Sequence, residues 1–272
     1  MTAFAAALAL VVGGGASAVS AQGAPPTGAP PVAAPSDTPD VLVLQKAFNA
    51  LRGSSMRQHQ VEMQMTGSGK SLQFSTRQRI DVTVKRPNRF RSEITMIKPD
   101  GSPGGRYVAV SDGARVWIHR PGMKQYAVVP RARFEAARDD LTVLGLVGLL
   151  FFNDELLGGI SAMTPENKQA VLTDLTRAGM RLSGTKESVG GIDYSAFTLE
   201  MPKEGITMRF FVEPRNATIR QMEMTIKDKS SDIVIKETVR SQTPAPELTA
   251  NTFRFTPPRG EKQVKELPVE PF

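Results

Sequence analysis

Apolar and polar side chains alternate with a period of two along most of the chain. A representative run is Val61, Met63 and Met65, whose members are separated by polar residues. Runs of this kind are typical of half-buried strands, and turn dipeptides such as Asp112-Gly113 separate them. The pattern predicts about ten or eleven short strands, most of them joined as antiparallel hairpins.

Three stretches depart from this alternation and predict helices. Thr38 as N-cap and Gly53 as stop delimit the first, and Thr164 and Gly179 delimit the last. Between them, Leu141–Phe152 is uncharged and almost wholly apolar. As a helix this segment would be roughly 18 Å long, which is short of the ~20 residues that a membrane span needs. We therefore expect it to lie buried or to cover an apolar cavity.

An antiparallel sheet of this size usually curls into a barrel or half-barrel. Because the predicted helices interrupt the series of strands, we expect them to plug or lid its concave face. The sequence therefore predicts the α+β class, with an incomplete antiparallel β-barrel wrapped around helices that lid an apolar cavity. We assign this single domain to residues 40–259, followed by a charged tail over residues 260–272.

The N-terminal segment has the layout of a secretory signal peptide over residues 1–21. An apolar run from Ala3 to Val12 is followed by glycines and by small residues before a predicted cleavage after Ala21. A disordered Ala-rich terminus is the alternative. Residues 22–39 are rich in Pro, Ala and Gly and predict an extended linker. We expect export to the periplasm without lipidation, because the chain has no Cys to carry a lipid.

The chain carries a net charge of +7, which suits anionic lipid headgroups or nucleic acid. Nucleic-acid binding would need exposed aromatic side chains among the basic residues. Phe90 is the one aromatic residue there, and its alternation with Ile94 points it inward. We expect a solvated outer face and no nucleic-acid binding, with docking to an anionic membrane surface as the alternative. The basic cluster comprises Arg77, Arg79, Lys85, Arg86, Arg89 and Arg91.

Three segments between Val84 and Pro130 resemble a known family. VKRPNRFRSEI starts at Val84, VSDGARVW starts at Val110, and MKQYAVVP ends at Pro130. These segments resemble the periplasmic lipoprotein-carrier superfamily typified by LolA, and the chain is also similar to exported bacterial proteins known as a domain of unknown function. From Val41 to Pro258 the order of elements agrees more loosely.

This resemblance implies an incomplete antiparallel barrel around helices, with an apolar cavity that receives acyl chains. Members carry lipoproteins between the two membranes, and relatives sense envelope damage or carry other lipids. The Pro-rich linker departs from this plan. The long apolar insert from Arg131 to Gly179 departs from it too. These two departures leave the ligand open.

Side chains that perform catalysis or bind metals are few. His59 and His119 are the two histidines, there is no Cys, and this pair has no spacing that indicates a metal site. His119 shares a strand face with Trp117, and we interpret it as a surface or hydrogen-bonded histidine. Asp154 and Glu155 are adjacent and therefore divergent, and we expect them to end the apolar helix.

Two short motifs imitate catalytic signatures. GSGKS starts at Gly67, but Gln64 stands where a phosphate loop needs glycine, and a strand follows instead of a helix. SGTK starts at Ser183 and lies in predicted sheet, whereas the S-x-x-K nucleophile begins a helix. We expect no enzymatic activity, no metal and no cofactor, and a hydrolase is the least supported alternative.

Methionines occupy several strand positions where Val or Ile would be usual. A soft Met side chain adapts to variable apolar partners, although ordinary core filling explains the choice equally well. We predict a monomeric periplasmic carrier that binds acyl chains of a lipid or an acylated lipoprotein, in transient contact with an anionic membrane surface or a membrane protein. The alternative is an envelope sensor or scaffold of the same fold that acts through protein–protein contacts.

The predicted lid is Leu141–Phe152, in which Gly145 and Gly148 give a smooth face. Burial of each methylene of a ligand would contribute about 0.8 kcal/mol. The predicted cavity is lined by Met63, Met65, Phe74, Ile80, Val82, Phe90, Ile94, Met96, Leu146, Leu149, Phe151, Phe152, Met208 and Phe210.

Overall fold

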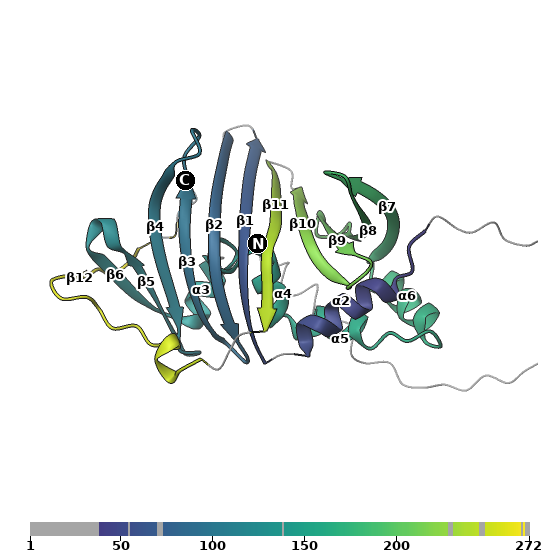
Figure 1. Cartoon of the computed structure of the whole chain (residues 1–272), viewed down its shortest axis with the longest axis horizontal. Coiled ribbons are helices and arrows are strands. Elements are labelled where there is room, and N and C mark those ends of the chain that lie inside the picture. Colours follow the sequence, from purple (N-terminus) through teal and green to yellow (C-terminus); the bar gives the residue numbers. More distant parts are fainter. Residues whose placement is uncertain are drawn as a thin grey trace, which may run out of the picture.

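The computed structural model describes residues 38–53, 55–69, 73–137, 139–227, 231–244, 248–267 and 269. The predicted signal peptide and nearly all of the predicted linker lie outside these residues. The described strands form one sheet of twelve, in the order β12-β6-β5-β4-β3-β2-β1-β11-β10-β9-β8-β7 (Figure 1). Every pairing is antiparallel except the short one between β12 and β6.

Two meanders meet at the centre of this sheet. The first meander consists of β1 (Met56–Gly69), β2 (Gln73–Lys85), β3 (Arg89–Ile97), β4 (Pro103–Ser111), β5 (Arg115–Arg120) and β6 (Gln125–Pro130). The second consists of β7 (Arg181–Val189), β8 (Ile192–Met201), β9 (Ile206–Glu213), β10 (Thr218–Lys227) and β11 (Ser231–Pro244), and β12 (Lys262–Gln263) adds to the far edge. The pairing of β1 with β11 joins the two halves.

The helices lie on one face of the sheet. Figure 1 shows α3 and α4 behind the middle strands, and α2 beside α5 and α6 near the β7–β10 end. The helices are α2 (Leu42–Arg52), α3 (Arg131–Ala137), α4 (Asp139–Phe152), α5 (Asp154–Ser161) and α6 (Lys168–Arg177), with short 3-10 turns at Pro121–Met123 and Ala250–Phe253. The sheet stays open, so the predicted α+β class with an incomplete antiparallel barrel around helices is confirmed.

The alternation of side chains places the core between the sheet and the helices. On β2, Ile80, Val82 and Val84 are fully buried, whereas Arg79 and Asp81 between them are exposed. This period of two is the one that antiparallel strands with one covered face require. The single core therefore lies on the face that carries α4.

Several predicted helix boundaries are wrong. Thr38 does not cap the first helix, which begins at Leu42, where Asp40 Oδ1 accepts a hydrogen bond from the Leu42 N–H (3.1 Å). Asp154 begins α5 instead of ending the apolar helix. The last helix begins at Lys168, because Thr164 lies in a preceding turn. α3 and α5 were not predicted, since each is at most eight residues long.

The outer face of the sheet is solvated, as expected from the sequence. Glu62 lies between Arg79 and Arg240, with N–O distances of 3.4 and 2.7 Å. Exposed pairs of this kind contribute about 0–1 kcal/mol each. Arg86 is the exception: its Nη2 donates to the Phe151 carbonyl (2.9 Å), and its guanidinium lies 4.9 Å from the Phe151 ring centroid. Its assignment to the outer face was therefore wrong.

The C-terminal residues pack onto the β5–β6 end of the sheet. His119 Nε2 lies 2.6 Å from Glu261 Oε2, and the His119 ring packs against that of Phe255 with the centroids 5.5 Å apart and the planes tilted by 54°. Leu267 and Val269 are buried. His119 is thus held by a carboxylate and an aromatic ring that the C-terminal segment supplies.

Candidate functional site

The structure places the predicted cavity residues on the covered face of the sheet, in two groups. The residues on β1, β2 and β3 lie beneath α4, which supplies Leu146, Leu149, Phe151 and Phe152. The two on β9 are separated from β1 by β10 and β11, and the Phe210 ring packs 5.4 Å from Phe48 of α2. Four of the predicted residues are partly buried, and the others are buried; the four are Phe74, Met96, Leu149 and Phe152.

Register partners in the sheet form apolar rows across this face. Directly opposed residues of neighbouring strands point to the same side and are in contact. One row crosses six strands without a polar member: Leu182, Leu199, Met208, Met224, Ile235 and Met65. It connects the β7 edge of the sheet with the central strand β1.

A second, parallel row includes two polar members. It consists of Phe197, Phe210, Met222, Glu237, Met63, Gln78 and Met96. Glu237 is completely buried and Gln78 is 2% exposed. Both side chains face α4 at the centre of the sheet, where polar groups need hydrogen-bond partners.

The partners of these polar residues are the backbone groups that a break in α4 frees. Gly145 has φ 68° and ψ 178°, which divides α4 into two helical segments. After the break, the Leu146 and Val147 N–H groups donate to Glu237 Oε2 (2.6 Å) and Oε1 (2.9 Å). Gln78 Nε2 in turn donates to the Thr142 carbonyl (2.9 Å).

Ser92 completes this set from β3, where its Oγ donates to the Val143 carbonyl (2.5 Å). Glu237, Gln78 and Ser92 together are here called the polar cradle. None of these three residues was predicted from the sequence. The signal was a polar residue at an apolar position of the alternation, as with Glu237 after Ile233 and Ile235 or Ser92 between Phe90 and Ile94.

Two buried titratable groups on this face have shifted pKa values. Burial raises the pKa of Glu237 to about 7, against the opposing effect of its two backbone hydrogen bonds. Burial, and next the charge of Arg57, lower the pKa of His59 to about 3. His59 is therefore neutral at physiological pH, and neither of its ring nitrogens has a hydrogen-bond partner among the described residues.

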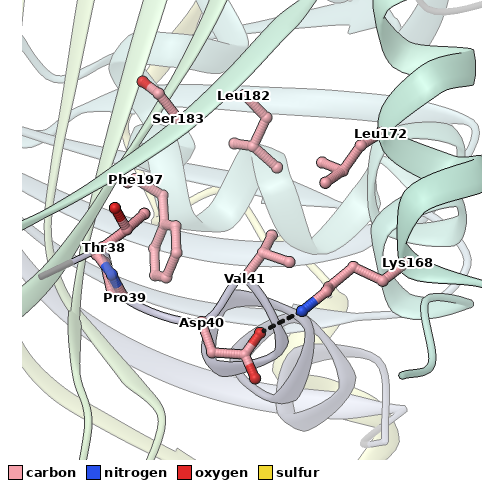
Figure 2. Close-up of a pocket in the computed structure, with 10 residues that line it drawn as sticks. Thr38, Pro39, Asp40, Val41, Lys168, Leu172, Leu182, Ser183 and Phe197 are labelled. Carbon is pink, nitrogen blue, oxygen red and sulfur yellow. Dashed lines mark hydrogen bonds and ion pairs between the residues drawn. The ribbon is translucent and has the colours of Figure 1, made fainter. Parts of the chain in front are cut away.

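A pocket of about 350 Å³ opens at the β7–β8 end of the covered face. Figure 2 shows Leu172 of α6 and Leu182 of β7 pointing toward Val41, with Phe197 of β8 at the other side. Leu182 and Phe197 are the terminal members of the two rows. The pocket is therefore continuous with the apolar face, and its remaining lining is Thr38, Pro39, Asp40, Lys168, Ser183 and Gly184.

An ion pair lies at one side of this pocket. Lys168 Nζ is 3.4 Å from Asp40 Oδ1, and both side chains are substantially exposed (Figure 2). The pocket thus combines aliphatic and aromatic walls with one exposed ion pair at its side. Ligand pockets usually have this composition, with few polar groups among apolar walls.

The structure brings together no set of catalytic or metal-binding side chains from the predicted motifs. His59 on β1 and His119 on β5 are separated by three strands. SGTK lies on β7, and Gly67 of GSGKS lies opposite Phe74 in the β1–β2 hairpin. Among the described residues, no group of three His, Asp or Glu could hold a metal ion. In the same part of the chain, no helix has the length and apolarity to cross a bilayer.

Comparison with known proteins identifies similar solved structures. No protein-family model and no curated protein sequence matches the chain. LprF from Mycobacterium bovis is 14% identical, with a TM-score of 0.41, and the alignment covers 80% of this chain and 100% of that one. A LolA superfamily protein from Nitrosomonas europaea is 13% identical, with a TM-score of 0.29 and coverage of 79% and 96%.

A third match is the MucA/MucB complex of Pseudomonas aeruginosa, at 8% identity and a TM-score of 0.34, with coverage of 79% of this chain and 60% of that chain. The fold of the described residues is an open antiparallel sheet wrapped around helices. The superfamily that the Val84–Pro130 motifs resemble is thus represented among the matched structures. At these identities and TM-scores the likeness concerns the fold alone.

Proposed function

We propose that this protein binds the acyl chain of a lipid or an acylated lipoprotein, and that the acyl chain enters through the pocket between Val41, Leu172, Leu182 and Phe197. The observation that supports this proposal is the continuity of that pocket with the two apolar rows of the covered face. A ligand that enters beside Phe197 meets apolar side chains from β8 to β10 without crossing a polar group. We propose a binding protein of the periplasm, without catalysis.

The pocket by itself accommodates only part of an acyl chain. Its volume of 350 Å³ lies near the lower end of the range of about 300–1,000 Å³ for ligand pockets. Each methylene buried there would contribute about 0.8 kcal/mol before the entropic costs of binding. In this proposal the exposed ammonium of Lys168, which pairs with Asp40, would contact an anionic headgroup that stays in solvent.

A longer acyl chain needs the space that α4 occupies. Thr142 to Gly148 of α4 are buried, and Leu146 and Phe151 pack against the predicted cavity residues of β1–β3. We propose that α4 is the lid predicted from the sequence, seated in the half-barrel in the ligand-free protein. In this proposal the fourteen predicted residues become the lining when α4 moves outward.

Uptake of a fluorescent fatty acid by delipidated protein tests the proposal. We expect saturable binding by the unmodified chain and at least tenfold weaker binding by Leu172→Trp, which fills the pocket. The matched control is Ala170→Trp, because Ala170 is exposed on the same helix. Absence of saturable uptake by the unmodified chain would contradict lipid binding. Equal binding by the two Trp variants would contradict this pocket as the entrance.

The second candidate function is that of an envelope sensor or scaffold that binds a protein. β7 is the last strand of the sheet, and its nine residues present a backbone edge that pairs with no further strand among those described. Such an edge can accept an additional strand from a partner. A photocrosslinker at exposed Ser188 should then capture a partner protein in intact cells. Capture of lipid alone would contradict this alternative.

A further inference from the structure

Glu237 occupies a position where an apolar residue would be expected. It follows Ile233 and Ile235 in the alternation of β11 and lies between Met63 of β1 and Met222 of β10. It is completely buried. A carboxylate in such a place is strongly destabilising unless hydrogen bonds compensate for its lost hydration.

The compensation comes entirely from α4. Both hydrogen bonds to the Glu237 carboxyl group are donated by the first two N–H groups after the break at Gly145. These groups form the N-terminus of the second helical segment, where free N–H groups and the helix dipole favour a negative charge. Movement of α4 away from the sheet would therefore leave Glu237 without either partner.

Gly145 makes this contact possible in two ways. Its φ of 68° with ψ of 178° belongs to a region that only glycine adopts readily. A Cβ at this position would overlap Oε2 of Glu237, so a larger residue would push the carboxyl group away. The two residues are thus matched to each other although 91 positions separate the donor Leu146 from Glu237 in the chain.

We propose that Glu237 and Gly145 form a catch that seats α4 in the half-barrel and thereby controls access of apolar ligands to the covered face. This inference rests on the proposed function, because it assigns to the lid the contact that holds it closed. Glu237 is in this sense a positioning residue, since it acts on the ligand through α4.

The protonation state of Glu237 makes the catch sensitive to pH. Glu237 faces Met63, Met222 and the Gly145–Val147 backbone, none of which titrates. On the same elements, His59 of β1 is buried and Asp140 of α4 is partly buried. Burial raises the pKa of Glu237 to about 7, from a model-compound value of 4.5. Opening would expose the carboxyl group and return its pKa toward 4.5.

The direction of the pH effect on opening follows from the difference in the pKa of Glu237 between the seated and open forms. Below pH 7 the seated form takes up a proton more readily than the open form, so acid favours the closed state. As the pH rises through about 7, the seated form must hold a buried carboxylate, and opening becomes easier. The opening equilibrium can change by up to about two orders of magnitude between pH 4.5 and pH 8.

The test measures uptake of diphenylhexatriene, an apolar probe that does not titrate, from pH 5.5 to 8.5. The unmodified chain should take up the probe more readily with rising pH, with a midpoint near 7 and at least a tenfold change. Glu237→Gln should bind without this pH dependence. Glu62→Gln is the control, because Glu62 is a carboxylate on the outer face of the neighbouring strand. It should keep the profile of the unmodified chain.

The possible failures are distinguishable. If the unmodified chain takes up no probe at any pH, the proposed function fails. If it takes up the probe and Glu237→Gln has the same pH profile, the catch is refuted while lipid binding stands. Hydrogen exchange of the Leu146 and Val147 amides in the unmodified chain gives a measurement that needs no variant. Their protection factors should fall by up to about tenfold from pH 6 to pH 8, and equal protection at both pH values would overturn the proposal.

Discussion

Replacement of Gly145 by alanine is the sharpest test of the way α4 is held. The new Cβ meets two obstacles. The backbone is held at φ 68° and ψ 178°, which an alanine adopts at a cost of about 1–3 kcal/mol. The Cβ also overlaps Glu237 Oε2 and would lie 3.4 Å from Val61 Cγ2, so the carboxyl group must move away from its two donors.

The expected loss combines these two contributions. Displacement of a buried carboxyl group from its hydrogen bonds costs about 1.5–3 kcal/mol. We therefore expect Gly145→Ala to lower the free energy of unfolding by roughly 3–5 kcal/mol, which corresponds to a fall in Tm of roughly 6–20 °C for a domain of this size. Urea unfolding followed by circular dichroism measures the free energy, and a thermal scan measures Tm.

Gly158→Ala is the matched control. Gly158 lies within helix α5, and a Cβ there would have no neighbour within 4 Å. We expect a change between zero and a gain of about 1 kcal/mol, because alanine favours the helix over glycine. In a double-mutant cycle, the losses caused by Gly145→Ala and Glu237→Ala should not add. A loss of under about 1 kcal/mol for Gly145→Ala, or strict additivity in the cycle, would refute the reasoning.

Four further predictions concern charged and titratable groups. Burial lowers the pKa of His59 from 6.5 to about 3, so the unfolded chain takes up a proton below pH 6.5 that the folded chain does not. The free energy of unfolding therefore falls by up to about 1.4 kcal/mol per pH unit between pH 6.5 and 3. His59→Phe should remove this loss, as measured by urea unfolding at several pH values. Between pH 6.5 and 4.5 the raised pKa of Glu237 has the opposite sign, so the stability of Glu237→Gln should fall more steeply with acid than that of the unmodified chain. Arg86→Met should lower the free energy of unfolding by about 1–3 kcal/mol, because it removes a charged hydrogen-bond donor from the Phe151 carbonyl at the end of α4. The control is Arg79→Met, since Arg79 is exposed, and an equal loss for the two variants would contradict this role of Arg86. Lys168→Ala should change the free energy of unfolding by less than about 1 kcal/mol. A larger loss, or a loss that persists in 1 M salt, would show that the ion pair beside the pocket is more than a surface contact.

Many of the elements follow from local pattern. Strands are predictable because successive side chains point to opposite faces, and runs such as Val61, Met63 and Met65 therefore record which side is covered. The burial of α4 is predictable from Leu141–Phe152, because this uncharged apolar segment is too short to span a membrane and is unfavourable in contact with water. Turn residues such as Asp112 act locally too: its Oδ1 accepts hydrogen bonds from the Ala114 and Arg115 N–H groups at 2.8 Å each.

The break in α4 could not be predicted in this way. The uninterrupted apolar run Leu141–Phe152 favours a continuous helix through Gly145, whereas in the structure that residue contacts Glu237 of a strand far along the chain. Arg86 was assigned to the wrong face for the same reason, since its acceptor is the Phe151 carbonyl of α4. The pocket between α2, α6 and β8 could not be predicted either, because the residues that line it come from distant parts of the chain.

The sequence by itself determined the periodicity of the elements, the identity of the covered faces and the apolar character of the central helix. Only the tertiary structure decided that β1 pairs with β11, that α4 breaks at Gly145, and that the apolar rows end in a pocket at Phe197. The physical reason is the separation along the chain between the residues that interact. Side-chain alternation reports burial residue by residue, whereas strand partners and buried hydrogen bonds between distant residues are selected by the free energy of the assembled whole.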